Sequence, residues 1–111
     1  MRWIQYKPFD EITATTDAYS DPIEIASVFS MGMHVHVVSG DAKGKGFFQV
    51  SCDPIYENPT NWVTFGSGAD LTGSATEAYE FQNVCANWVR LYWDHASGTG
   101  TLRAHIKTNG Y

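Results

Sequence analysis

Four histidines are the residues whose type and spacing could bind a metal ion. His34 and His36 flank Val35, so both imidazoles lie on one face of an extended strand, and His95 and His105 come near the end of the chain. Two histidines at this spacing can reach one zinc ion, but a zinc site needs further ligands at fixed geometry, and nothing else clusters here in sequence. We therefore expect solvent-facing strand histidines, with no metal site and no cofactor.

Carboxylates, serines and glycines do not form a catalytic pattern either. Asp10 and Glu11 are adjacent, so their side chains diverge, and Glu77 and Glu80 fall on opposite faces of a strand, which does not suit glycoside hydrolysis. There is no Gly-x-Ser-x-Gly elbow, and the glycines of 40–46 lack the following helix and the ending of a phosphate-binding loop. We expect no catalytic residue and a protein that is not an enzyme.

The composition of the chain limits the kinds of partner that it can bind. The chain has 111 residues, with 7 Lys and Arg against 12 Asp and Glu and a net charge of -5. The few basic residues are scattered, which argues against binding to nucleic acid or to an anionic membrane. No apolar run is long enough to span a membrane, and residues 1–7 lack a signal-peptide core, so we expect no export.

Two cysteines leave two alternatives open. Cys52 and Cys85 are too few to form the disulfide framework of a small secreted protein. Reduced, mostly buried thiols are the simpler interpretation, and a disulfide between them is the other.

Apolar residues alternate with polar ones almost throughout, which predicts β-strands. In 29–38 one face carries Phe29, Met31, Met33, Val35 and Val37. The Gly-rich segment 39–46 is interpreted as the loop of a hairpin whose second strand is 47–52. Segments 88–94 and 101–107, joined at 97–100, are predicted to pair as a closing hairpin. Further candidate strands are 12–16, 23–26, 61–65 and 77–82.

About eight short strands, each with one apolar face, cannot bury those faces in one flat sheet. We therefore predict an all-β fold: a two-sheet antiparallel β-sandwich, jelly-roll-like, with an extended N-terminal arm. Residues 12–111 form a single β-sandwich domain, and residues 1–11 form an N-terminal arm or an edge strand, because Pro8 limits ladder pairing.

Aromatic residues provide the candidate protein interface. Those of 1–11 lie on a segment too short for its own core, so a neighbouring subunit should cover them, and two more share the outward face of Arg90. The expected interface residues are Trp3, Tyr6, Phe9, Trp88 and Tyr92. The aromatics assigned to the core are Phe48, Trp62, Phe81 and Trp93.

The order of four motifs resembles a group of small phage structural proteins, whose strands read QASNDG…TNW, YVRL.Y and SGTGTL. The corresponding segments here are 49–53 (QVSCD), 59–63 (PTNWV), 88–92 (WVRLY) and 97–102 (SGTGTL). The chain is similar to a capsid decoration protein (cement or staple) of a short-tailed, double-stranded DNA phage of the epsilon15 type. The turn of that group is replaced here by Cys52-Asp53-Pro54 and a longer loop, so the loop conformation is not carried over.

This resemblance implies a structural virion protein, made in the host cytoplasm, that binds the outer capsid surface and clamps neighbouring major capsid subunits. It also implies a homo-oligomer, dimer or trimer, on the shell. The alternative is a carbohydrate-binding jelly-roll module used in host-surface adhesion, for which 56–58 (Tyr-Glu-Asn) near Trp62 is the only stretch that could serve.

Overall fold

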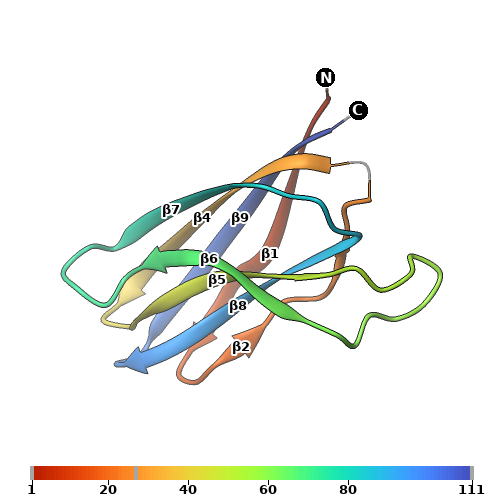
Figure 1. Cartoon of the computed structure of the whole chain (residues 1–111). Helices are drawn as coiled ribbons and strands as arrows, with labels where there is room; N and C mark the ends of the chain where they lie inside the picture. Colours follow the sequence, from red (N-terminus) through yellow and green to blue (C-terminus); the bar gives the residue numbers. More distant parts are fainter. Residues whose placement is uncertain (1, 27, 111) are drawn as a thin grey trace.

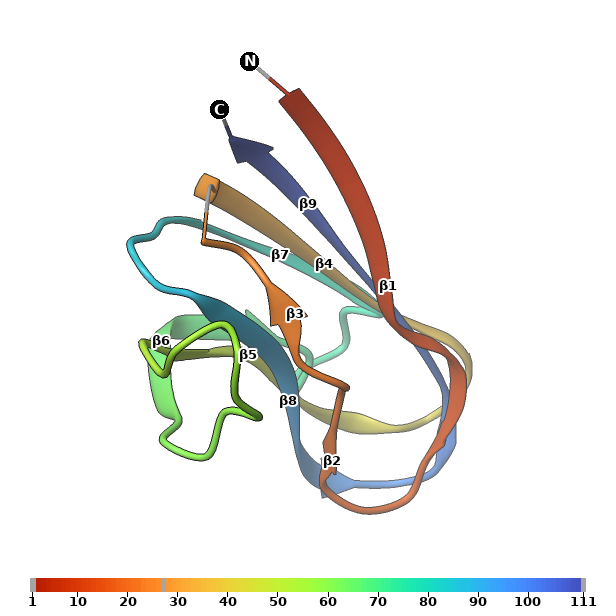
Figure 2. The same ribbon diagram turned by 90° about the vertical axis from the view of Figure 1, so that its right-hand side faces the viewer.

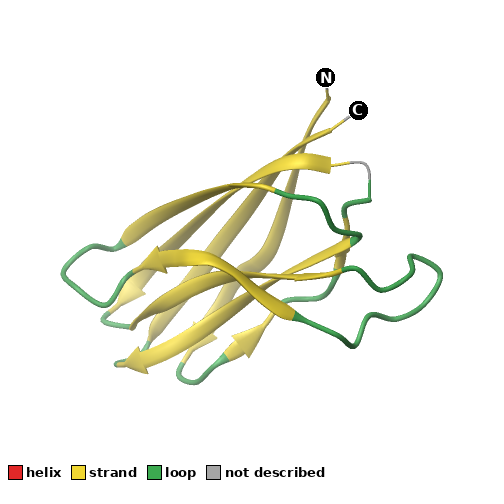
Figure 3. Ribbon diagram, viewed as in Figure 1, coloured by secondary structure: helices red, strands yellow, loops and turns green. Residues whose placement is uncertain are grey.

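The computed structural model describes residues 2–26 and 28–110, without the side chains of residues 2 and 3. Over these residues the chain forms nine strands and no helix, in two antiparallel sheets that pack face to face (Figures 1 to 3). The prediction of an all-β, two-sheet sandwich is therefore confirmed. None of the described residues forms a helix that could cross a membrane.

Four strands make the first sheet, in the order β1-β9-β4-β7. Their bounds are Arg2–Ala14 for β1, Val28–Gly40 for β4, Glu77–Asn83 for β7 and Gly100–Gly110 for β9. The second sheet has the order β2-β8-β5-β6, with β3 also paired to β8. Its strands are β2 (Ala18–Tyr19), β3 (Ile23–Glu24), β5 (Lys43–Ser51), β6 (Val63–Asp70) and β8 (Trp88–Ser97).

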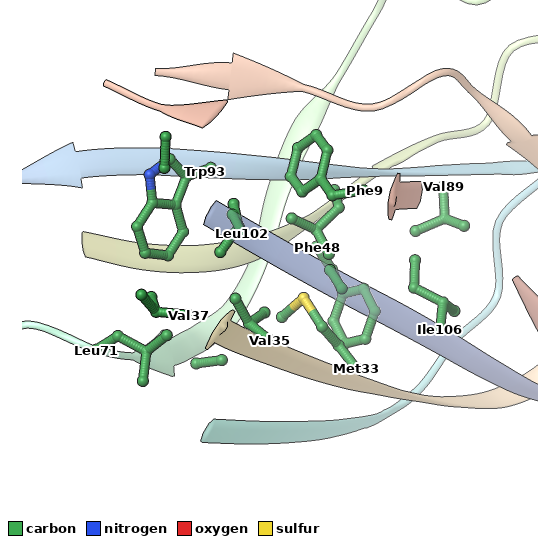
Figure 4. Close-up of a cluster of buried hydrophobic side chains, with 14 of the residues drawn as sticks. Phe9, Met33, Val35, Val37, Phe48, Leu71, Val89, Trp93, Leu102 and Ile106 are labelled. Atoms are coloured by element: carbon green, nitrogen blue, oxygen red, sulfur yellow. The ribbon is translucent and has the colours of Figure 1, made fainter. Parts of the chain in front are cut away.

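The core lies between the sheets, and period-two alternation places its residues there (Figure 4). Strand β4 contributes Met33 and Val35, and β8 contributes Leu91 and Trp93, all of them fully buried. Burying each side chain of this size stabilises the fold by about 1.5–3 kcal/mol. The inward faces expected for the segments 29–38, 88–94 and 101–107 are therefore the observed ones, although Phe29 is only half-buried.

Both predicted hairpins are wrong. Strand β4 lies in the first sheet and β5 in the second, and β8 and β9 are divided in the same way. The two connections cross from sheet to sheet side by side, where Asp41 N–H donates to the Thr99 carbonyl (2.8 Å) and Thr99 N–H donates to Asp41 Oδ1 (3.1 Å). Alternation identifies the buried face of a strand, but it does not identify the strand's partner.

Segment 43–46, expected as part of a loop, is the beginning of β5. Its glycines are required by packing. A Cβ on Gly44 would lie 2.6 Å from Trp93 Cζ2, and one on Gly46 would lie 2.7 Å from Val35 Cγ2. Because the backbone of β5 passes this close to the core side chains, no larger residue fits there.

Residues 2–14 are the edge strand β1, paired along its length with β9. The ladder shifts register between Tyr6 and Phe9 and again between Phe9 and Ile12, which carries the strand past Pro8. Phe9 is only 3% exposed and belongs to the core cluster, and Tyr6 packs against that cluster. The expectation that Phe9 is left for a neighbouring subunit to cover is therefore corrected. The side chain of Trp3 lies outside the described residues.

Both cysteines are free, exposed thiols, which corrects the expectation that they are mostly buried. Cys52 comes directly after the end of β5, and Cys85 lies in the connection between β7 and β8. Neither position belongs to the alternating part of a strand, so neither side chain is directed into the core.

Candidate interaction surfaces

Among residues 2–26 and 28–110, no three His, Cys, Asp or Glu side chains lie close enough to share a metal ion. His95 is engaged within the fold: its Nδ1 accepts from the Trp93 indole N–H (3.1 Å) and its Nε2 donates to the Gly98 carbonyl (2.8 Å). These two bonds are satisfied together by one neutral tautomer. His95 therefore serves to pair the buried indole of Trp93.

The other three histidines meet on the outer face of the four-stranded sheet. His105 of β9, His34 of β4 and Tyr79 of β7 form a row across three strands, with ring centroids 6.3 Å and 4.4 Å apart and planes within 17°. His36 stacks 6.0 Å from His34. Such cross-strand stacking aligns the rings and stabilises the sheet.

Hydrogen bonds hold this row in place. His34 Nε2 donates to Glu77 Oε2 (3.3 Å), and Gln5 Nε2 donates to His105 Nδ1 (3.1 Å). Burial lowers the pKa of His105, and its neighbours Lys7, His34 and Arg103 lower it further, while Asp10 acts in the opposite direction. The lowered pKa favours the neutral imidazole of His105, whose Nδ1 can accept from Gln5.

Next to this row lies a groove of about 630 Å³. In a second row of paired residues, Gly32 of β4 lies between Lys107 of β9 and Phe81 of β7. Because glycine has no side chain, this second row has a gap at its centre. Gln5, His34, Tyr79 and His105 complete the walls. The groove thus opens on the outer face of the four-stranded sheet.

Phe81 was assigned to the core, and the structure shows it 66% exposed, next to Tyr79 at 73%. The inward face of β7 carries Glu80, the buried residue of this strand, whose Oε1 accepts from the Gly68 N–H (3.1 Å) and from Gln82 Nε2 (3.1 Å). A Cβ on Gly66 would lie 2.1 Å from the same Oε1. Because the glycines of β6 leave room for this carboxylate and supply a donor, the acid faces inward and the aromatics face outward.

A second stack covers the outer face of the five-stranded sheet. The Arg90 guanidinium lies between the rings of Tyr19 and Trp62, at 4.2 Å and 4.4 Å from their centroids. Tyr92 stacks on Tyr19 (4.7 Å), and Phe47 lies 6.4 Å from Tyr92. This cation–π arrangement leaves Trp62 half-buried on the outside, not in the core as expected.

The expected interface residues on β8 are thus engaged within the chain. Tyr92 donates its hydroxyl to Asp17 Oδ2 (3.2 Å), and burial with this carboxylate raises the pKa of Tyr92 to about 12. Trp88 donates its indole N–H to the Pro54 carbonyl (3.4 Å). Both side chains are half-buried, so each keeps some surface on the outside.

The loop 52–62 between β5 and β6 is organised by one carboxylate. Asp53 Oδ2 accepts from the backbone N–H of Thr60 (2.8 Å) and Asn61 (3.0 Å), and Oδ1 accepts from Asn61 Nδ2 (3.0 Å). These bonds lower the pKa of Asp53 to about 2. Asn87 Nδ2 also donates to the Asp53 carbonyl (3.1 Å), which ties the loop to the start of β8.

This ordered loop exposes apolar side chains at the end of the sandwich. Tyr56 is 82% exposed and Ile55 is 48% exposed, and Val63 at the start of β6 is also exposed. In Figure 1 the loop extends beyond the sheets. The sequence alone did not identify Ile55 as a candidate, although its position in a Pro-bounded loop beside Tyr56 was the available signal.

No family model matches the chain, and no curated protein is similar to it in sequence. Among solved structures, the SPBc2 prophage-derived protein YomS has a TM-score of 0.62 at 10% identity, over 96% of this chain and 92% of that one. The two share a fold.

Two further structures have lower scores. A chain from the structure of Bacillus endospore appendages, described as a family of disulfide-linked pili, has a TM-score of 0.43 at 17% identity, over 98% of this chain and 89% of that one. A chain of the infectious bursal disease virus Gx strain has 0.47 at 7% identity, over 98% of this chain and 32% of that one. Both TM-scores lie below 0.5, so of these three structures only YomS supports a shared fold.

Proposed function

We propose that this protein is a non-enzymatic structural component of a phage virion. It attaches to the outer capsid surface, binds the major capsid protein and clamps neighbouring subunits together. The motif order of 49–102 supports this role, and so does the fold shared with a prophage-derived protein. On the shell, the chain forms a dimer or trimer with its own copies.

The observation that carries the proposal is the ordered loop 52–62. Tyr and other large apolar side chains dominate the binding energy of protein interfaces when they enter a pocket of the partner. A loop that is already ordered loses little conformational entropy on binding. Asp53 holds the two ends of the loop together through Thr60 and Asn61, and the exposed Ile55 and Tyr56 between them are available to contact a capsid subunit.

A clamp needs a second contact, and the edge strand β1 offers one. The side of β1 facing away from β9 has no partner strand among the described residues. An extended segment of a capsid subunit can add to such an edge through backbone hydrogen bonds. Two contacts on one rigid body make attachment much tighter than either contact alone.

The test is binding to undecorated capsid shells of the phage that encodes the chain, measured by co-sedimentation. We expect the double change of Ile55→Ala and Tyr56→Ala to weaken attachment at least tenfold, since interface hot spots typically contribute 2 kcal/mol or more. The thermal midpoint should stay unchanged, because both side chains are exposed. Val38→Ala, an exposed apolar residue on β4, is the control.

Two results would contradict the proposal, and they are distinct. If the wild-type protein does not bind shells, the virion role is wrong. If the wild type binds and the double variant binds equally well, the role stands but the loop is not the clamp.

A further inference from the structure

The groove on the outer face of the four-stranded sheet opens over Gly32, and the packing of the sheet does not require a glycine at this position. A Cβ on Gly32 would meet its nearest neighbours, Glu80 O and Phe81 Cδ2, at 3.9 Å and 4.0 Å, which are ordinary contact distances. Its backbone is extended within β4, where a larger residue would be favoured. Gly44 and Gly46, in contrast, are enforced by close contacts. The fold tolerates a side chain at position 32, and the sequence leaves it out.

We propose that this groove binds an acidic saccharide, a sugar ring that carries a carboxylate. This inference does not depend on the capsid contact of the loop 52–62; the groove shares only β1 with the proposed capsid attachment, through Gln5. It also differs from the sugar site considered around Tyr56 and Trp62, because it lies on the other sheet.

The walls of the groove offer contacts for both the apolar C–H face and the hydroxyl groups of a sugar. Phe81 and Tyr79 present exposed aromatic rings, on which the apolar C–H face of a pyranose can stack. The Tyr79 ring is held by His34 at 4.4 Å with planes 10° apart, so its position is set before a ligand arrives. Gln5 and His105 add an amide and an imidazole that can bond hydroxyl groups.

Charge selects an acidic ligand. The protein has a net charge of -5, yet among the residues that the structure describes no Asp or Glu lines this groove, and Lys107 does. Lys7 also lies near enough to lower the pKa of His105, whereas Arg103 is paired with Glu11 and Asp10 acts in the opposite direction, so the positive charge of the groove comes from the two lysines. A carboxylate on the ligand would therefore be attracted to the Lys107 side of the groove.

Size favours a small ligand over a protein. A volume of about 630 Å³ falls within the range of roughly 300–1,000 Å³ that is typical of small-molecule sites. This volume accommodates a short oligosaccharide. An acidic peptide would carry the same charge as an acidic saccharide. Its binding does not require two adjacent aromatic rings beside the space above Gly32.

The experiment titrates the full-length protein with three probes and follows binding by calorimetry and amide NMR. The probes are trigalacturonic acid, the neutral trisaccharide galactotriose, and a tri-glutamate peptide. We expect trigalacturonic acid to bind, with chemical-shift changes at Gly32, Phe81 and Lys107. Galactotriose should bind at least tenfold more weakly, and the peptide should not bind.

Variants test each part of the groove. Phe81→Ala should weaken trigalacturonic acid binding at least threefold, as expected from losing one stacking ring. Lys107→Gln should remove most of the preference for the acidic over the neutral sugar, whereas Lys43→Gln, the same change on the other sheet, should not. Gly32→Thr should abolish binding by filling the floor, with an unchanged or higher thermal midpoint.

The proposal is overturned if trigalacturonic acid does not bind, if either other probe binds equally well, or if Lys107→Gln behaves like Lys43→Gln. Should Gly32→Thr fail to fold, Phe81→Ala still decides, because Phe81 is exposed and its removal leaves the core intact.

Discussion

Asp53 organises the longest loop of the chain with a single carboxylate. Its pKa of about 2 lies below the usual value of 3.8, so the folded protein binds this proton more weakly than the unfolded chain does. The stabilising effect of Asp53 is therefore complete above about pH 4 and is lost as the pH falls through 2. An NMR titration of the Asp53 side-chain carboxyl carbon should give a midpoint near 2. The amide signals of Thr60 and Asn61 should change with the same midpoint, because both amides donate to this carboxylate.

Removing this carboxylate should release the loop without unfolding the sandwich. We expect Asp53→Ala to speed hydrogen exchange at the Thr60 and Asn61 amides, while core strands keep their protection. Asp70→Ala is the matched control, since Asp70 accepts only from the Thr72 N–H (2.9 Å) and hydroxyl (2.6 Å). Unchanged exchange in Asp53→Ala would show that the loop is held by other contacts.

At the scale of elements, the edge strand β1 is part of the core and not a detachable arm. Phe9 is buried between the sheets, so Phe9→Ala should lower the free energy of unfolding by about 3–5 kcal/mol, as other buried Phe→Ala changes do. Lys7→Ala on the exposed side of the same strand should change it by less than about 0.5 kcal/mol. Urea denaturation measures both values.

The same argument applies to truncation. Deleting residues 2–10 removes Phe9 and most of the residues of β1 that pair with β9, so we expect the truncated chain to unfold at a lower urea concentration. If Phe9→Ala and the deletion both leave the urea midpoint unchanged, β1 is not needed for the fold and is available as an arm.

At the scale of the whole molecule, most strand pairs join distant parts of the chain. Strand β1 pairs with β9 along its length, and the neighbouring strands β4–β5 and β8–β9 cross between sheets instead of forming hairpins. Folds dominated by such non-local pairing fold in roughly milliseconds to seconds. Stopped-flow Trp fluorescence should therefore show refolding in this range, and a complete microsecond transition would contradict it.

The loop 52–62 and the groove are also separate at this scale, although the groove includes Gln5 of the edge strand β1. The loop 52–62 belongs to the end of the five-stranded sheet, and the groove lies on the outer face of the four-stranded sheet. Changes at Tyr56 and at Phe81 should consequently affect different ligands and act additively on stability.

The sequence by itself determined the all-β class and the inward faces of the strands at 29–38, 88–94 and 101–107. Successive side chains of a strand point to opposite sides whatever its neighbours are, so local alternation carries this information. Pairing is different, because a short Gly-containing connection can return to the same sheet or cross to the other. The segments 39–46 and 97–100 look like hairpin turns for that reason, and only the packed structure shows the crossings.

The candidate sites were decided by tertiary structure. Whether Glu80 or Phe81 faces inward on β7 depends on the space and the N–H group that Gly66 and Gly68 provide from another strand. The groove needs side chains from β1, β4, β7 and β9 around Gly32, which the sequence separates by up to about a hundred positions. A local pattern cannot report such neighbours, because the sheet register that brings them together is set by the pairing of whole strands.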